Sequence, residues 1–291
     1  MRLAYLQLAA AMALVGANIP VAKAAVPFIP VFIFSLIRYG VSVAVLAPFI
    51  ANEPGGRFRD MSRSDWGYIT LQALCGGLLY MVFMLYGLQY TSAMTAGIIT
   101  STVPLGVALL ALILLGERFG PLTGAALALA MLGILAVNTA SPAQDIAPWP
   151  LLGNALVGAA VIAESLFVIF ARRMAASLAP CRMAMALNAI GLIMVAPFAV
   201  SDLMDFSPSG VPLEIWPLPV FYALTSSALA LILWYRGLSV VPASKAAIFT
   251  STFPISAVAV AIIFLGEQLQ WAHGIGLICV LAAIFIGTRD R

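Results

Sequence analysis

The sequence predicts an all-α polytopic membrane protein whose ten transmembrane helices form two inverted five-helix repeats. Three observations carry this prediction: the composition, a repeated segment and the placement of the positive charges. Of the 291 residues, 63% are hydrophobic and 9% are charged. In an ordinary soluble domain about a quarter of the residues are charged, so this chain is too apolar to be one.

Apolar runs of about 20 residues, the length that crosses a bilayer as a helix, recur along the whole chain. Turn-rich breaks divide them into ten expected spans, at residues 4–25, 30–50, 66–90, 93–115, 120–138, 150–172, 180–201, 217–238, 243–265 and 270–288. The first 24 residues also have features of a cleavable signal peptide. Because their removal would leave one repeat a helix short, we expect them to remain as the first span.

Residues 87–134 and 237–284 form an internal sequence repeat. At a constant offset of 150, 17 of the 48 positions are identical, among them Pro104 and Glu117 with their counterparts Pro254 and Glu267. We therefore place the first repeat at residues 1–140 and the second at 141–291. Corresponding membrane segments that are both interrupted by proline are a sequence sign of a transporter's central site.

Lysine and arginine are distributed on one side of the predicted membrane. If the N-terminus is cytoplasmic, that side receives twelve of them and the opposite loops receive none. The twelve are Arg2, Arg57, Arg59, Arg63, Arg118, Arg172, Arg173, Arg182, Arg236, Lys245, Arg289 and Arg291. The positive-inside rule then puts both termini in the cytoplasm. Since five spans per repeat is an odd number, the second repeat is inverted, as in alternating-access carriers.

Three prolines mark expected helix breaks or gating points, because proline removes a helix hydrogen bond and frees a carbonyl group upstream. They are Pro20, Pro104 and Pro254. Hydroxyl residues precede two of them, and those expected to line a substrate cavity are Thr100, Ser101, Thr250 and Ser251. The alternative is that these hydroxyls only satisfy the carbonyls that the prolines free.

Charged residues inside the spans are few, and each costs about 2.5–3.5 kcal/mol at a helix centre. Glu164 lies nine residues before Arg173 and therefore near mid-membrane. It is either a proton site or ligand for a substrate ammonium group, or the partner of an internal ion pair with Arg38. Arg38 is assigned more readily to the fold than to the substrate. Lys23, close to the outer surface, either snorkels or forms part of an outer gate.

Aromatic and amide side chains complete the expected cavity. Tyr80, Phe83 and Met84 fall near one helical face at spacings of three and four and could line a pocket for a bulky side chain, with simple packing as the alternative. In the second repeat, Trp234 corresponds to Met84, and Ser227 corresponds to a glycine.

Several stretches resemble the ten-helix EamA family of the drug/metabolite transporter superfamily. They are Gly16 to Lys23, Arg38, Tyr86 to Ala93, and the duplicated proline and Gly-Glu pattern at Pro104, Gly116-Glu117, Pro254 and Gly266-Glu267. The resemblance covers the whole chain, with one departure: many members have tryptophan where this chain has Val15. It implies a cavity between spans 1, 3, 4, 6, 8 and 9, to which Asn18 and Phe167 would also contribute. Within the superfamily the chain is most similar to bacterial inner-membrane exporters of amino acids, of the aromatic-amino-acid type.

The expected function is therefore secondary export of small amphipathic metabolites by alternating access, with neutral and aromatic amino acids as the substrates and protons as a candidate coupling ion. A multidrug efflux carrier is the alternative, and a non-transporting receptor or scaffold is the alternative from another class. The sequence has a single histidine and no phosphate-binding loop. We expect no enzyme activity, cofactor, metal or nucleic acid partner, and a monomer or a weak homodimer in the lipid bilayer.

Overall fold

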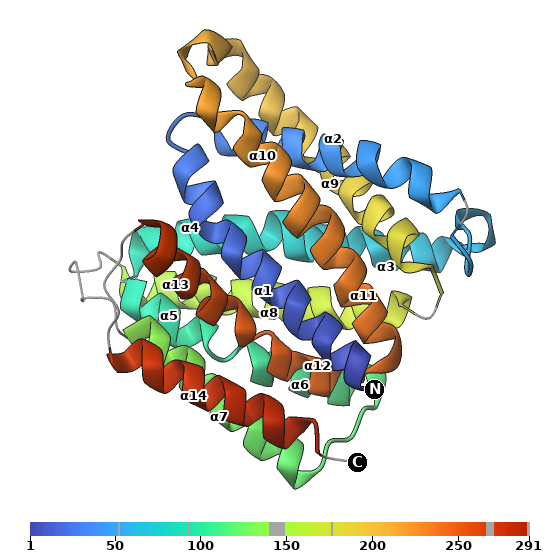
Figure 1. Cartoon of the computed structure of the whole chain (residues 1–291), viewed down its shortest axis with the longest axis vertical. Coiled ribbons are helices and arrows are strands. Elements are labelled where there is room, and N and C mark those ends of the chain that lie inside the picture. Colours follow the sequence, from blue (N-terminus) through green and yellow to red (C-terminus); the bar gives the residue numbers. More distant parts are fainter. Residues whose placement is uncertain (52, 92, 140–148, 176, 266–270, 290–291) are drawn as a thin grey trace.

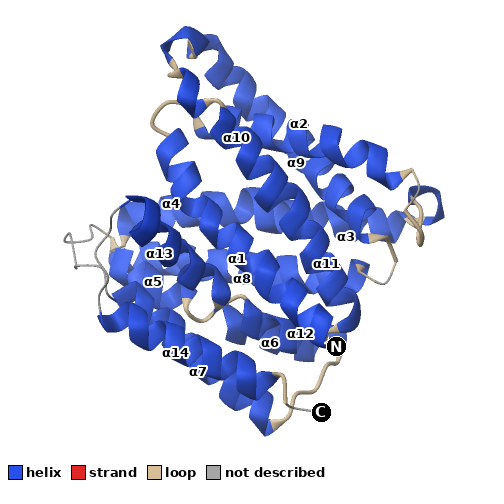
Figure 2. Ribbon diagram, in the orientation of Figure 1, coloured by secondary structure: helices blue, strands red, loops and turns tan. Residues whose placement is uncertain are grey.

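The computed structural model describes residues 1–51, 53–91, 93–139, 149–175, 177–265 and 271–289. Every regular element in these ranges is helical (Figure 2). The first repeat contains α1 (Arg2–Ala25), α2 (Val31–Ile50), η1 (Phe58–Asp60), α3 (Arg63–Ala73), η2 (Leu74–Leu79), α4 (Tyr80–Tyr90), α5 (Ala93–Thr100), α6 (Val103–Leu115) and α7 (Pro121–Thr139).

The second repeat follows the same order. It contains α8 (Pro150–Met174), α9 (Pro180–Asp205), η3 (Pro208–Gly210), η4 (Leu213–Ile215), α10 (Pro217–Tyr222), η5 (Ala223–Ala230), α11 (Leu231–Val240), α12 (Ala243–Phe249), α13 (Thr252–Leu265) and α14 (Trp271–Gly287). All ten predicted spans are helical. Within the described residues, eight helical stretches are long and apolar enough to cross a membrane, and two shorter apolar helices lie at 121–136 and 271–287.

The two repeats pack around a pseudo-two-fold axis. Helix α1 packs against α11 and α13, and its counterpart α8 packs against the corresponding helices α4 and α6. The remaining helices pair with their own counterparts, α2 with α9 on one flank and α7 with α14 on the other (Figure 1). The start of α1 and the end of α14 lie at the same end of the bundle, which we call the termini end. The fold class predicted from the sequence is confirmed.

Close packing at two corresponding glycines shows how well the symmetry is kept. A Cβ atom on Gly87 would lie 2.7 Å from Cγ2 of Val157 on α8. A Cβ atom on Gly237 would lie 2.6 Å from Cδ2 of Leu8, the residue of α1 that corresponds to Val157. Both distances are far below van der Waals contact. The shared Gly-Leu pair of the repeat thus lets α4 approach α8, and α11 approach α1.

The expected helix breaks at Pro104 and Pro254 are confirmed. Span four divides into α5 and α6, and span nine into α12 and α13, with the proline in the first turn of the second piece. The break expected at Pro20 is wrong, because α1 continues through this residue. The fixed φ of proline is itself helical, and α1 is supported by its packing against α11 and α13.

Spans three and eight each contain a π-helical segment that the sequence did not predict. These segments, η2 (Leu74–Leu79) and η5 (Ala223–Ala230), occupy corresponding positions in the two repeats. A π-helix holds an extra residue per turn, is rarely stable for long, and is often found at functional sites. Both segments lie at the middle of their spans, where a transporter binds its substrate.

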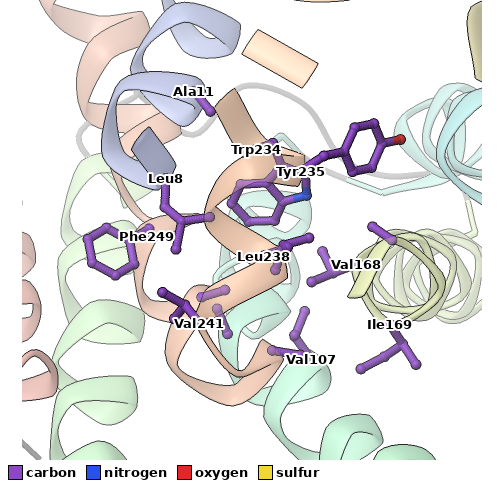
Figure 3. Packing of buried hydrophobic residues seen from close by; sticks show 14 of the residues in the cluster. Leu8, Ala11, Val107, Val168, Ile169, Trp234, Tyr235, Leu238, Val241 and Phe249 are labelled. Atoms are coloured by element: carbon purple, nitrogen blue, oxygen red, sulfur yellow. The ribbon is translucent and has the colours of Figure 1, made fainter. Parts of the chain in front are cut away.

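The largest hydrophobic core lies toward the termini end of the bundle. Trp234, Leu238 and Val241 pack there against Leu8 of α1 and Phe249 of α12 (Figure 3). Val107 of α6 and two residues of α8, Val168 and Ile169, close the cluster on the other side. The core therefore joins helices of both repeats at one end.

Candidate functional site

The middle of α8 brings three predicted site residues near one another. Glu164 is half-buried, and the hydroxyl of Tyr80 at the start of α4 is close enough to its carboxylate to interact electrostatically. One turn further along α8, the ring of Phe167 lies directly against Gly76 of η2. This arrangement, termed the Glu164 cluster (Glu164, Tyr80, Phe167 and Gly76), joins α8 to the π-helical part of span three.

The corresponding place in the other half has different chemistry. Asn18 of α1 donates a hydrogen bond from Nδ2 to the Thr225 hydroxyl of η5 at 2.9 Å and another to the carbonyl oxygen of Leu14 at 2.8 Å. Asn18 corresponds to Phe167, and η5 corresponds to η2. On one side of the pseudo-two-fold axis the contact is the polar pair of Asn18 and Thr225. On the other side it is the ring of Phe167 against Gly76. Asn18 is 1% exposed, so it ties α1 to η5 in this conformation.

Arg38 is engaged away from Glu164. Its guanidinium donates to the Tyr39 hydroxyl at 2.7 Å and to the Ser227 hydroxyl at 3.2 Å, and it lies 4.2 Å from the centre of the Tyr39 ring. The carbonyl oxygen of Ser227 in turn accepts a hydrogen bond from Asn188 at 2.8 Å. Arg38 and Ser227 therefore connect α2, η5 and α9. This corrects two expectations: Arg38 is not the ion-pair partner of Glu164, and Ser227 belongs to this contact rather than to a cavity wall.

The hydroxyls in the two breaks bond to carbonyl groups at the end of the helix that precedes each break. Ser101 donates to the carbonyl oxygen of Ile98 at 2.6 Å, and Thr250 and Ser251 donate to the carbonyls three residues earlier. Thr100 is half-buried. Ser101 also lines an apolar groove of about 450 Å³ between α6 and α7, at the edge of the bundle. Ser101, Thr250 and Ser251 thus bond at the helix breaks, in line with the alternative considered for them, and the expected cavity role of Thr100 stays a prediction.

Trp234 lies in the core, which corrects its expected place in a cavity. It is 1% exposed, and its indole N–H has no partner among the described residues. Its neighbour Tyr235 accepts a hydrogen bond from Gln72 of α3 at 2.9 Å. Phe83 and Met84 on α4 are half-buried. A helix in a membrane is apolar on every side, so the sequence does not separate a face turned to the core from one turned to a cavity.

Lys23 lies in the last turn of α1 and is exposed, in agreement with a position near the membrane surface. Among the described residues, no group of three or more His, Cys, Asp or Glu side chains is arranged to hold a metal ion. No metal site is therefore assigned to them.

Burial differs between corresponding residues of the two repeats. Val107 of α6, near the termini end, is fully buried, whereas its counterpart Ala257 of α13 is half-buried. Val168 of α8 is 1% exposed, whereas its counterpart Ile19 of α1 is 41% exposed. In a symmetric arrangement such pairs would be buried equally. The repeats are thus packed more tightly at the termini end than at the opposite end.

Glu117 is a contact residue whose role the sequence did not reveal. Its carboxylate accepts hydrogen bonds from the backbone N–H groups of Ala243 at 3.1 Å and Ser244 at 3.0 Å, and from the Ser244 hydroxyl at 3.2 Å. It also pairs with Arg172, whose Nε lies 3.5 Å away. The duplicated Gly-Glu motif was the signal for it. The counterpart Glu267 lies outside the described residues.

Comparisons with known proteins agree with this architecture. The model of the EamA-like transporter family matches residues 2–139 and 151–289. The chain is 36% identical to the uncharacterized transporter YetK of Bacillus subtilis over 285 residues, which are 97% of this chain and 86% of that protein. It is 23% identical to an uncharacterized transporter of Archaeoglobus fulgidus over 269 residues, 92% of each chain. One crystal structure superimposes with a TM-score of 0.79 at 20% identity over 98% of both chains, which supports the fold.

Proposed function

Because the chain belongs to the EamA-like transporter family, we propose that it is a secondary transporter of a bacterial inner membrane that exports small amphipathic metabolites by alternating access. Neutral and aromatic amino acids are the proposed substrates. The protein is a multi-pass membrane protein of a transporter family, and the substrate class, the direction and the site residues are our proposal.

The Glu164 cluster is the observation that carries the choice of substrate. A carboxylate inside a membrane is stable either when protonated or when it faces a cation. Among the described residues no lysine or arginine pairs with Glu164, and Arg38 is held by Tyr39 and Ser227. A substrate ammonium group would supply the missing positive charge. The neighbouring rings of Tyr80 and Phe167 would then contact an apolar or aromatic side chain.

The same reasoning gives the position that we propose for the substrate. We place the substrate between α1 and α8, with its ammonium group toward Glu164 and its side chain toward Phe167 and the half-buried Phe83 and Met84. A zwitterion fits a site that offers one fixed charge. A phosphate-bearing substrate would need several converging basic groups.

The termini end is proposed to be cytoplasmic. Support comes from the twelve lysine and arginine residues that the loops and ends on this side receive against none in the opposite loops. A fluorescent protein that folds only in the cytoplasm, fused after Arg291, would be bright under this proposal. A dark fusion with normal expression would reverse the orientation.

Transport into proteoliposomes tests the function. Purified protein is reconstituted, and uptake of a panel of labelled amino acids is measured with and without a pH gradient, with protein-free liposomes as the control. We expect saturable uptake of neutral and aromatic amino acids. Indifference of folded protein to the whole panel would overturn the proposal, and transport of apolar organic cations instead would favour the multidrug alternative.

A further inference from the structure

We propose that Glu117 is the latch that holds this transporter closed at its cytoplasmic end, and that release of its carboxylate from Arg172 and from α12 opens the substrate site to the cytoplasm. The role rests on the proposed transport function, but the geometry that carries it does not depend on which substrate is moved.

The chain is built to aim Glu117 at the other repeat. Helix α6 ends at Leu115 and is capped by Gly116, whose φ of 67° is a left-handed conformation that glycine adopts without strain. The N–H of Glu117 then bonds back to the carbonyl oxygen of Ala111 at 3.1 Å, which fixes the direction of the turn. The side chain therefore leaves α6 in a set direction, toward α12.

The Glu117 carboxylate has four hydrogen-bond donors, three at the start of α12 and one on α8. Two are backbone N–H groups, of Ala243 and Ser244, at the start of α12; the third is the Ser244 hydroxyl. Arg172, at the end of α8, adds the positive charge, and its Nη1 also donates to the carbonyl oxygen of Leu238 at the end of α11. One side chain of the first repeat is thus bound to α8 and α12 of the second, and through Arg172 to α11.

Partial burial makes these contacts strong. The Glu117 side chain is 16% exposed and that of Arg172 is 26% exposed, so both are largely withdrawn from water. Hydrogen bonds to an ionised acceptor are about twice as strong as neutral ones. An ion pair on an open surface contributes much less.

The latch closes the end of the bundle that is already the more tightly packed. The core around Trp234 and Leu238 (Figure 3) adjoins it, because Arg172 donates to the carbonyl oxygen of Leu238. Val107 is fully buried there, while Ala257 at the opposite end is not. Opening this end requires α6 to move away from α12. The Glu117 carboxylate cannot stay with α12 during this movement, because the turn that carries Glu117 is fixed to α6. The contacts of Glu117 therefore exist in the closed state and are lost in the open one, which is the property of a gate.

Two reporter cysteines at corresponding positions can follow the gate without any substrate. The full-length protein, with Cys75, Cys181 and Cys279 replaced by alanine, carries either Val107→Cys or Ala257→Cys. Its reaction with a water-soluble maleimide is timed in lipid nanodiscs, where the reagent reaches both faces. Each reporter is measured with native Glu117, with Glu117→Gln, and with Arg118→Gln as a control that removes an exposed charge one residue away.

Glu117→Gln is expected to raise the labelling rate of Val107→Cys by about tenfold, since loss of a charge-assisted contact of about 1.4 kcal/mol changes an equilibrium that much. The rate at Ala257→Cys should stay the same or fall, and Arg118→Gln should change neither rate. Arg172→Gln should act like Glu117→Gln, and the double variant should add little to the larger single effect.

The proposal is overturned if Val107→Cys stays protected in Glu117→Gln. It is also overturned if both reporters become more reactive together, because Glu117 would then support the fold in general, or if Arg118→Gln acts equally. Labelling that changes as expected in a protein that moves no amino acid would leave the latch standing and reject the proposed substrate. Transport with unchanged labelling would do the reverse.

Discussion

Replacement of Gly76 by alanine tests the contact on which the Glu164 cluster depends. A Cβ atom at this position would lie 2.8 Å from Cγ and 3.1 Å from Cε2 of Phe167, whereas carbon atoms in contact are separated by about 3.5–4.0 Å. The aromatic ring would have to move by roughly 1 Å. Overpacking of this kind destabilises a core by about 1–3 kcal/mol.

Gly77 is the matched control, because it lies in the same π-helix. A Cβ atom there would have only the Tyr39 hydroxyl nearby, at 3.6 Å, which is ordinary contact. Both substitutions remove the same backbone freedom from the unfolded chain, so the difference between their unfolding free energies isolates the clash with Phe167. Gly76→Ala should be the less stable of the two by about 1–3 kcal/mol, and Phe167→Leu in the same chain should recover part of the loss.

The assay is reversible unfolding in mixed micelles, followed by uptake of labelled tryptophan and alanine by the folded fraction. Since Phe167 is proposed to contact the substrate side chain, Gly76→Ala should reduce tryptophan uptake more than alanine uptake. Equal stabilities of Gly76→Ala and Gly77→Ala would refute the packing argument. Equal losses of tryptophan and alanine uptake would refute the assigned role of Phe167.

Three further outcomes are expected. Glu164→Gln should abolish most amino-acid uptake at unchanged stability, because it removes the charge that we propose to face the ammonium group; uptake at the native rate, with the same response to a pH gradient, would reduce Glu164 to packing. Pro254→Ala restores an N–H that can bond to the carbonyl of Thr250 and lengthen α13 backward, so exchange should slow more than expression falls, and equal losses would point to a folding role. Arg38→Gln should lower the free energy of unfolding by about 1–3 kcal/mol with transport per folded molecule retained; lost transport in a stable protein would contradict its structural assignment.

The sequence predicted the parts of the fold that depend on composition and periodicity. A helix of about 20 apolar residues has few alternatives in a bilayer, so the ten spans appear close to their expected limits. Proline acts through its own missing N–H, and Pro104 and Pro254 interrupt their spans as expected. Pro20 shows the limit of that rule, because packing on neighbouring helices maintains α1 through it.

The orientation of individual side chains could not be predicted equally well. Lipid and protein core are both apolar, so no amphipathic pattern tells which face of α11 carries Trp234 into the core. Arg38 was assigned a fold role from its span, but its partners Tyr39 and Ser227 come from contacts that no spacing reveals. In the sequence, Glu117 is recognisable only as part of the Gly-Glu pair that both repeats share. The groups that Glu117 contacts, the N–H groups of Ala243 and Ser244, are 126 and 127 residues away in the chain.

Counterflow measures alternating access most directly. Liposomes that contain the protein are loaded with an unlabelled neutral amino acid and diluted into a trace of the labelled one. A carrier whose single site faces one side at a time returns loaded, so the label should accumulate transiently above its equilibrium level and then decay. Label that only approaches equilibrium, at a rate that internal amino acid leaves unchanged, would contradict the account.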